Sequence, residues 1–568
     1  GRDTRWLSVS HGKDHHTIQM DLYFAEISLW PFDVDYGWGN SETRKTHLFT
    51  DRLIYQPGDV VRLKGHVRDW ADGKMKMPVG ETLTIRARDS RGHKFFSKDV
   101  TVSERGSFDA TIQLAKGVSG SATISAGAQD HYIDVYEYEP ATFKLRFPGR
   151  RQFAPGEAIE IPMNAGFYFG KPLAGAKAFW SFTDRRTVFS PAGWSKFEFG
   201  ESNDERNTEC SGEGTLSPEG RLVIRPEVAD DLILPLPLEG SFSVRITDAN
   251  GQSISGSTAV IRHSSEYYLA LRELPRVRWA KQPIPLQVVA GKSDGGAAAL
   301  GQYFSATLNR IEWHSVKMKG AGGVVRYKNE RKVIRICETD LKTTARDADP
   351  IPSTLLPPEA GEYELELRAA DAKGRLIQNT TTFYVRGEKP LAWDYRNEFQ
   401  MEMVPDRGVY QTGSMATILL KAPFSGRALV TVEREKVLRS FSVNVTGNAP
   451  AIEVPLLEGD APNVFVSVML LRGSADSTRK IKTAEYRIGY CELKVERPSS
   501  RLHVKANLAH SDYQPGEEVE VLLSVNDHAG ASVSGTEVTL YAVDEGILDL
   551  TGYEAPDLHS FFYAPRKL

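Results

Sequence analysis

Tyr55-Gln-Pro-Gly-Asp59 is a phrase that this chain repeats with small changes. It returns as Phe153-Ala-Pro-Gly-Glu157, Tyr410-Gln-Thr-Gly-Ser414 and Tyr513-Gln-Pro-Gly-Glu517. Proline followed by glycine suits the two central positions of a type II turn, where glycine supplies the positive φ. An alternating run that is typical of a half-buried strand follows the phrase, as in Val519-Glu-Val521. We interpret the phrase as a structural turn rather than a binding site, and its residues are Tyr55, Pro57, Gly58, Phe153, Pro155, Gly156, Tyr410, Gly413, Tyr513, Pro515 and Gly516.

The spacing of the copies predicts domains of similar size. Phe153 lies 98 residues after Tyr55, and Tyr513 lies 103 residues after Tyr410. The longer interval between Phe153 and Tyr410 contains a degenerate copy, Trp279-Ala-Lys-Gln-Pro283. A period of about 100–130 residues is the size of a β-sandwich domain and far exceeds the repeat of a solenoid.

Two further patterns favour antiparallel strands. The pattern Gly-x-aromatic begins at Gly106, Gly240 and Gly361, and each copy leads into a run in which apolar and polar residues strictly alternate. Asp-x-x-Gly links two strand-like runs at Asp89, Asp248 and Asp371, with residue types that short hairpins need. Helical periodicity is nearly absent. The sequence therefore predicts an all-β protein built of tandem antiparallel β-sandwich domains of the immunoglobulin or fibronectin kind.

The phases of the repeat predict where the domains divide. The expected divisions are 1–40 for the end of a preceding domain with a linker, then 41–138, 139–263, 264–388 and 389–495 for one β-sandwich each, and 496–568 for an incomplete domain. The linkers are short, so we expect neighbouring domains to pack against one another.

Composition excludes several classes of function. Seventy basic and seventy-four acidic residues leave a net charge of −4, which gives no excess to bind nucleic acid or an anionic membrane surface. The apolar stretches are too short to span a bilayer, so we expect no membrane contact by this segment. Cys210, Cys337 and Cys491 form no Cys-x-x-Cys pair and have no histidines at zinc spacing.

Two loose groupings of possible metal ligands fall short of a site. His11, His15 and His16 would need a further ligand from elsewhere, and we interpret them as exposed loop histidines. Asp33 and Asp35 lie among tryptophans, which could indicate calcium or sugar, but they lack the ligand count of a calcium loop. The sequence predicts no metal, no cofactor and no catalytic residues.

Three longer strings resemble one known family. The run from Thr50 to Asp69 and the run from Pro405 to Glu433 resemble the strand–turn–strand opening of a macroglobulin-like domain. The end of the chain, from Tyr541 to Tyr553 and then Phe561-Phe-Tyr-Ala-Pro-Arg566, resembles the stretch before the bait region of bacterial alpha-2-macroglobulins. The order of the strings also matches, so the divisions from 41 to 568, and the preceding domain that ends within 1–40, are expected to be macroglobulin-like.

The resemblance implies a frame of a large protease-trapping protein rather than an enzyme. In the family, a target endopeptidase cuts an exposed bait segment, the protein rearranges, and in many members a thioester from a Cys-x-Glu-Gln string couples to the protease. No such string occurs at Cys210, Cys337 or Cys491, so no thioester is expected in this chain. The implied location is the periplasm, at the inner membrane through a segment before Gly1. The implied partners are target endopeptidases, the downstream portion of the same protein and other envelope proteins.

Two alternatives remain open, and one local expectation concerns the chain's end. The protein could be a non-inhibitory scaffold of the same family in an envelope complex, or an unrelated adhesin or sugar-binding array. The run Val538–Val543 is predicted to be a strand of the incomplete domain. The end of the chain is expected to be mobile from about Thr551 and readily cut after Arg566 or Lys567, unless a second chain completes the sheet.

Overall fold

The computed structural model describes most of the chain. The described residues are 5–11, 14–20, 29–32, 34–35, 44–71, 74–136, 142–191, 193–200, 206–227, 236–295, 298–319, 325–387, 393–394, 399–447, 449–473, 484–510, 513, 516–543 and 553–568. Almost all regular structure in them is strand, so the all-β prediction is confirmed. No described helix is long and apolar enough to cross a membrane.

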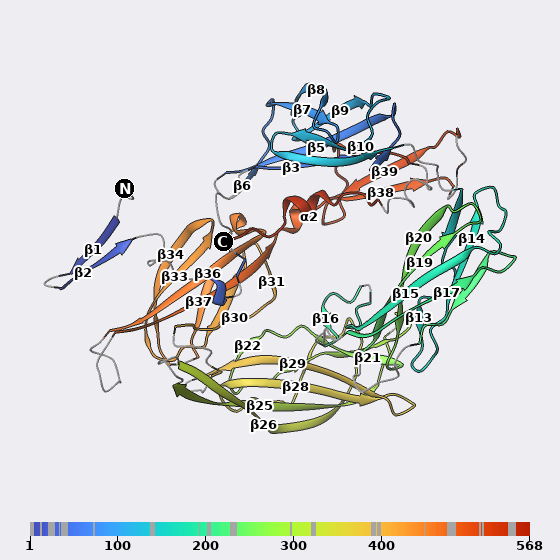
Figure 1. Ribbon diagram of the computed structural model, residues 1–568. Coiled ribbons are helices and arrows are strands. Elements are labelled where there is room, and N and C mark those ends of the chain that lie inside the picture. Colours follow the sequence, from blue (N-terminus) through green and yellow to red (C-terminus); the bar gives the residue numbers. More distant parts are fainter. Residues whose placement is uncertain are drawn as a thin grey trace.

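Four sandwiches follow one another around a ring, and we call them units one to four (Figure 1). Their sheets lie within residues 44–136, 143–262, 267–386 and 403–496, except that a sheet of unit three also includes the short strand Phe197–Glu198. Each unit has its own buried apolar cluster between its two layers. Residues of the last division, 496–568, lie between unit four and unit one (Figure 1).

Units one and two share a plan in which a shorter sheet faces a sheet of five described strands. In unit one the shorter sheet has β3 (Arg44–Thr50), β5 (Val60–Ala71), β6 (Lys74–Lys76) and β9 (Ser107–Gln113), and the longer has β4 (Ile54–Tyr55), β11 (Gln129–Val135), β10 (Gly120–Ala126), β7 (Thr82–Arg88) and β8 (Lys94–Thr101). In unit two they are β12 (Phe143–Arg146), β14 (Ile161–Phe167) and β18 (Arg221–Ile224), and β13 (Gln152–Phe153), β20 (Ser253–Arg262), β19 (Leu238–Thr247), β15 (Lys177–Arg186) and β17 (Arg206–Thr215).

Units three and four repeat that plan. Unit three has β16 (Phe197–Glu198), β21 (Tyr267–Arg272) and β24 (Val288–Lys292), the pair β23 (Pro285–Leu286) and β27 (Ile351–Pro352), and the longer sheet β22 (Val277–Trp279), β29 (Leu376–Arg386), β28 (Gly361–Ala370), β25 (Tyr303–Lys319) and β26 (Val325–Lys342). Unit four has β30 (Met403–Pro405), β32 (Met415–Leu420) and β35 (Ala451–Pro455), and β31 (Val409–Gln411), β37 (Glu485–Glu496), β36 (Asn463–Arg472), β33 (Gly426–Arg434) and β34 (Lys436–Val445).

The repeated phrase has the same place in each of the four units. Its aromatic residue lies in a short strand that pairs in parallel with the last strand of the same unit: Tyr55 with Val135, Phe153 with Arg262, Trp279 with Arg386, and Tyr410 with Val495. The degenerate copy at Trp279 is therefore a true member of the series. Tyr55, Phe153 and Tyr410 are fully buried, whereas Trp279 is half exposed.

The turns after the aromatic residues have the geometry of type II turns. Gly58, Gly156 and Gly413 have φ of 93°, 75° and 82°. The amide of the next residue closes each turn onto the residue three positions back, with N···O distances of 3.0 Å in the first two copies and 3.2 Å in the third. Gly516 has φ of 90°, while Pro515 lies outside the described residues.

The Asp-x-x-Gly links are hairpins whose aspartate accepts two backbone hydrogen bonds. Asp89 Oδ1 accepts from the amides of Arg91 and His93 at 2.9 and 2.8 Å. Asp248 and Asp371 repeat this pattern. Asp527 does the same toward Ala529 and Ala531, both at 2.9 Å, which adds a copy that the sequence patterns did not single out.

One crossing departs from the predicted boundaries. The segment between β15 and β17 leaves unit two, and β16 pairs with β21 of unit three. Asn379 fixes this crossing, because its buried side-chain amide donates to the carbonyls of Glu198 at 2.8 Å and Leu269 at 3.0 Å. Asn379 lies in a glycosylation triplet, but this burial leaves no room for a glycan.

The expectation of a strand at Val538–Val543 is wrong. The described residues of the last division contain one sheet, the pair β38 (His503–Leu508) and β39 (Val521–Asn526), one α-helix, α2 (Leu558–Phe562), and a 3₁₀ turn at Pro498–Ser500. Residues 538–543 make no ladder with another described strand. A strong β propensity produces a strand only where a neighbour supplies the ladder's hydrogen bonds.

The N-terminal division contains a hairpin and a packed turn. β1 (Arg5–His11) pairs with β2 (Asp14–Met20), and a 3₁₀ turn covers Trp30–Phe32. The predicted histidine grouping lies in this hairpin, and the side chains of His11, His15 and His16 lie outside the described part of the structure, as does Asp33. Phe32 packs against Tyr490 of unit four, with ring centroids 5.1 Å apart.

Candidate functional site: the docked tail

The C-terminal residues 553–568, which we call the tail, contain one short helix and an extended end. Helix α2 begins after Asp557, whose carboxylate accepts from the Ser560 amide at 3.0 Å and from the Ser560 hydroxyl at 2.7 Å. This capping explains why a five-residue helix forms here. Phe562 points into the protein and is buried.

Unit one holds the first part of the tail through its sheet face. The Tyr553 hydroxyl donates to the Thr50 carbonyl at 2.7 Å. The Phe561 ring stacks on His47, with centroids 4.5 Å apart, and the Arg68 guanidinium lies 5.3 Å from the centre of the Phe562 ring. The contacts combine apolar burial with cation–π attraction, so α2 is fixed on unit one.

Unit four holds the second part through one asparagine. The Asn463 side chain accepts from the Arg566 amide and donates to the Arg566 carbonyl, both at 2.8 Å. Asn463 is fully buried, and this double contact mimics the pairing of two strands. Because it uses only backbone atoms of the tail, it fixes the path of the chain whatever residue stands at position 566.

The Arg566 side chain joins three parts of the molecule. Its guanidinium bonds to Glu435 of unit four and lies 4.6 Å from the centre of the Trp70 ring of unit one. Arg434 of unit four lies on the same ring at 5.5 Å. Burial lowers the pKa of Arg434, and the nearby Arg566 lowers it further. Units one and four therefore share a contact that the tail completes.

The last residues contact the N-terminal division. The Leu568 amide donates to the Asp35 carbonyl at 2.9 Å, and Lys567 Nζ lies 3.4 Å from Asp35 Oδ1. The sequence predicts that this end is mobile and is cut after Arg566 or Lys567. In the structure the Arg566 side chain is only 6% exposed, so cleavage there requires the tail to detach first. That cleavage stays a prediction, with this added condition.

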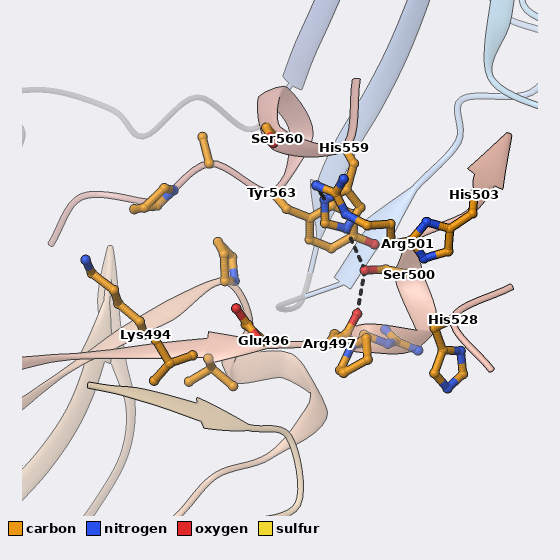
Figure 2. A pocket seen from close by; sticks show the side chains of 16 residues that line it. Lys494, Glu496, Arg497, Ser500, Arg501, His503, His528, His559, Ser560 and Tyr563 are labelled. Atoms are coloured by element: carbon orange, nitrogen blue, oxygen red, sulfur yellow. Dashed lines mark hydrogen bonds between the residues drawn. The ribbon is translucent and has the colours of Figure 1, made fainter. Parts of the chain in front are cut away.

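A pocket of about 550 Å³ lies beside the tail, where the chain leaves unit four (Figure 2). Most of its charged or titratable side chains are basic: Lys494, Arg497, Arg501, His503, His528 and His559, against Glu496. Figure 2 shows Ser500 between His559 and the backbone of Arg497. The Ser500 hydroxyl lies 2.9 Å from His559 Nε2 and donates to the Arg497 carbonyl at 2.7 Å.

The segment that follows β39 also contacts unit one. Glu537 pairs with Lys64 at 2.6 Å and accepts from the Ser107 hydroxyl at 2.6 Å. These contacts lower the pKa of Glu537, the Lys64 bond most of all. Burial in the same region lowers the pKa of His66 to about 4, so this imidazole is neutral at physiological pH. The last division is thus anchored on unit one before the tail begins.

The sequence-predicted residues do not gather at this site. The turn residues of the first, second and fourth copies lie in separate units, and Tyr513 lies in the last division, where its hydroxyl accepts from the His510 amide at 3.2 Å. Only Arg566 and Lys567 belong to the tail. Asn463, Glu435 and Trp70 were missed, because a single asparagine, glutamate or tryptophan has no pattern that marks its partner in sequence.

All three thiols are free; Cys491 is buried, while Cys210 and Cys337 are half-buried. Burial raises the pKa of the Cys491 thiol, so it stays protonated and unreactive. Among the described residues no group of three or more His, Cys, Asp or Glu could hold a metal ion.

Comparisons with known proteins agree with this architecture. The domain family "Alpha-2-macroglobulin bait region domain" matches residues 401–550, and the MG2 domain family matches residues 45–137. An alpha-2-macroglobulin homologue from Nostoc is 25% identical over 95% of this chain. The chain belongs to the bacterial alpha-2-macroglobulin family. This is a family of protease inhibitors rather than of enzymes.

The family members that match are much longer than this chain. It covers 29% of the Nostoc homologue and 32% of an alpha-2-macroglobulin from Xylella fastidiosa, to which it is 22% identical over 92% of its length. The native conformation of Escherichia coli alpha-2-macroglobulin aligns with a TM-score of 0.47 and 18% identity, over 98% of this chain and 36% of that one. The chain therefore spans about a third of the length of such relatives.

Proposed function

We propose that this alpha-2-macroglobulin chain is the frame of a broad-spectrum protease trap, set off when a target endopeptidase cuts the bait. The position of the tail carries the proposal. The tail follows a stretch matched as a bait region domain, and it contacts units one and four at once. A trap needs an arrangement of rigid parts that depends on one cleavable connection.

The contacts suit such a connection because they are few and cooperative. Release of Arg566 would remove the two backbone bonds to Asn463, the bond to Glu435 and the stacking on Trp70 together. Units one and four would then keep the contact of Arg434 with Trp70 but lose the part that the tail completes, while their own cores stay intact. The frame holds the units at fixed distances and rearranges after the cut, and the target protease supplies the catalysis.

We further propose that the protein acts in the periplasm, held at the inner membrane by a segment outside these 568 residues. The bacterial origin of the relatives supports this location. Its partners would be target endopeptidases, the remaining portion of the same protein and, in a scaffold role, other envelope proteins. Fractionation of cells that produce the full-length protein tests the location, and recovery in the cytoplasmic fraction would contradict it.

The test of trapping compares two substrates of the same protease. The full-length protein is incubated with stoichiometric endopeptidase, and residual activity is measured on a large protein and on a small peptide. A trap lowers activity on the large substrate and leaves the small one accessible. The 568-residue chain alone serves as control and is expected neither to inhibit nor to hydrolyse. Full activity on both substrates after cutting would favour a non-inhibitory scaffold.

A further inference from the structure

One histidine of the tail makes two hydrogen bonds that only its neutral form can make together. His559 Nε2 lies 2.9 Å from Ser500 Oγ, and Nδ1 lies 3.1 Å from Arg501 Nη2. A guanidinium has donors and no acceptor, so Nδ1 must accept and carries no proton. Ser500 gives its own proton to the Arg497 carbonyl, so it accepts from Nε2–H. The two contacts fix one neutral tautomer of the imidazole.

We propose that His559 makes docking of the tail sensitive to pH, so that mild acid loosens α2 from the segment 497–501. Protonation of Nδ1 breaks the bond to Arg501 and places two cations side by side. The Ser500 bond survives, because Nε2–H is present in both forms. Protonation therefore weakens docking in two ways only: the hydrogen bond to Arg501 is lost, and the imidazolium and the Arg501 guanidinium repel each other.

The surrounding charges act in both directions. Asp557 opposes the effect of Arg501: its carboxylate lies 3.6 Å from Arg501, and its charge favours the protonated form of His559. Tyr563 of the tail stacks on His559, with ring centroids 4.7 Å apart, and its aromatic face attracts the protonated imidazole. The other charged or titratable groups around His559 are Lys494, Glu496 and Arg497 from unit four, His503 and His528 of the last division, and Lys45, His47, His66, Arg68, Arg105 and Glu537 near the face of unit one. Burial and Arg501 lower the pKa of His559, against the opposite effect of Asp557.

The sign of the effect follows from that direction. A free imidazole has a pKa of about 6.5, and the docked one lies below it, so the undocked tail binds more protons. The free energy that favours docking of the tail is therefore greatest above about pH 7, and it decreases as the pH falls through about 6.5. Burial lowers the pKa of His47 as well, so this ring, which stacks on Phe561 of the tail, can add to the same pH response.

Hydrogen exchange of the tail at different pH values tests the inference. The full chain is labelled at pH 7.5 and 5.5, with exposure times scaled for intrinsic exchange, and peptides covering residues 553–568 are followed by mass spectrometry. Protection of the tail is expected to fall by up to about tenfold between these values. His559→Gln keeps one acceptor and one donor but cannot be protonated, so its protection should depend on pH much less than that of the wild type. Peptides from β28 report whether the variants remain folded.

Matched variants separate this histidine from its neighbours. His503→Gln and His528→Gln change side chains of the same pocket and should retain the wild-type response. His47→Gln changes the ring under Phe561 and measures the share of the response that comes from that ring. The same pH response in His559→Gln, or no response in the wild type, would overturn the inference. The biological consequence rests on the proposed trap, but exchange is measured without any protease. A failure of trapping and a failure of this pH response are therefore distinguishable.

Discussion

Two tyrosines of the repeated phrase donate to an aspartate four residues earlier. The Tyr55 hydroxyl bonds to Asp51 Oδ1 at 2.7 Å, and the Tyr410 hydroxyl bonds to Asp406 Oδ1 at 2.8 Å. Asp406 also accepts from the Thr417 amide at 2.8 Å, which ties the phrase to the strand after the turn. Burial raises the pKa of both tyrosines, so the hydroxyls remain donors at any physiological pH. The aromatic residue of the phrase thus does more than fill the core.

The turn glycine of unit one gives a prediction at the same scale. Gly58 has φ of 93°, and a Cβ there would meet only Lys116, at 3.8 Å. The cost of a side chain is therefore conformational rather than steric. Gly58→Val should destabilise unit one by about 1–3 kcal/mol, because a β-branched residue is forced into the left-handed region. Exchange of β4 and β11 amides measures the loss.

Gly117 is the matched control for Gly58. It lies in the same unit, its Cβ would have open space, and its φ is not in the left-handed region. Gly117→Val should leave unit one within about 0.5 kcal/mol of the wild type. Equal effects of the two substitutions would show that the positive φ is not what Gly58 provides.

At the scale of elements, local pattern predicted the strands that have neighbours within their own unit. The alternation after Gly106, Gly240 and Gly361 became β9, β19 and β28, and the degenerate copy at Trp279 became the parallel strand β22. The run Val538–Val543 had the same local signal and formed no strand, because propensity cannot show whether a partner is present. Docking of the tail was equally hidden, since Arg566 and Asn463 are 103 residues apart and meet only after two units have folded.

The contact of Asn463 with the tail gives a prediction for that element. Asn463→Ala removes both hydrogen bonds to the Arg566 backbone, which together contribute about 2 kcal/mol. The open state of the tail should then be populated roughly 30-fold more. Trypsin should cut after Arg566 faster by a similar factor, as long as the tail opens and closes faster than trypsin cleaves it. The rate is followed by mass spectrometry of the released end of the chain.

A second asparagine of unit four provides the control for that experiment. Asn444 lies on β34 and is exposed, so Asn444→Ala should leave cleavage after Arg566 unchanged. Asn463 also donates to Glu492 at 2.8 Å, so exchange of β37 must be compared to show that unit four remains folded. Unchanged cleavage in a folded Asn463→Ala protein would show that the asparagine does not hold the tail.

At the scale of the whole molecule, the indole of Trp70 lies where the first and last of the four units meet. Trp70 of unit one receives Arg434 of unit four and Arg566 of the tail. Trp70→Ala should remove about 1–3 kcal/mol from the closed arrangement, because two cation–π contacts are lost. We expect the radius of gyration from small-angle X-ray scattering to increase as units one and four separate.

Trp279 is a suitable comparison for Trp70. It is half exposed in unit three and stacks on Arg386 of the same unit, at 3.6 Å. Trp279→Ala should leave the radius of gyration unchanged. If the two substitutions gave equal scattering curves, units one and four would be held together by contacts other than the shared ring.

The parallel pairing of the first and last strands has a consequence during synthesis. In each of the four units, the short strand of the phrase, made early, must wait for the last strand of that unit before its ladder can form. The wait from Tyr410 to Val495 is 85 residues, which at about 5–20 residues per second is some 4–17 seconds on the ribosome. Such long-range pairing slows folding. Each nascent unit thus spends seconds with an open edge, which makes it a substrate for chaperones until its final strand emerges.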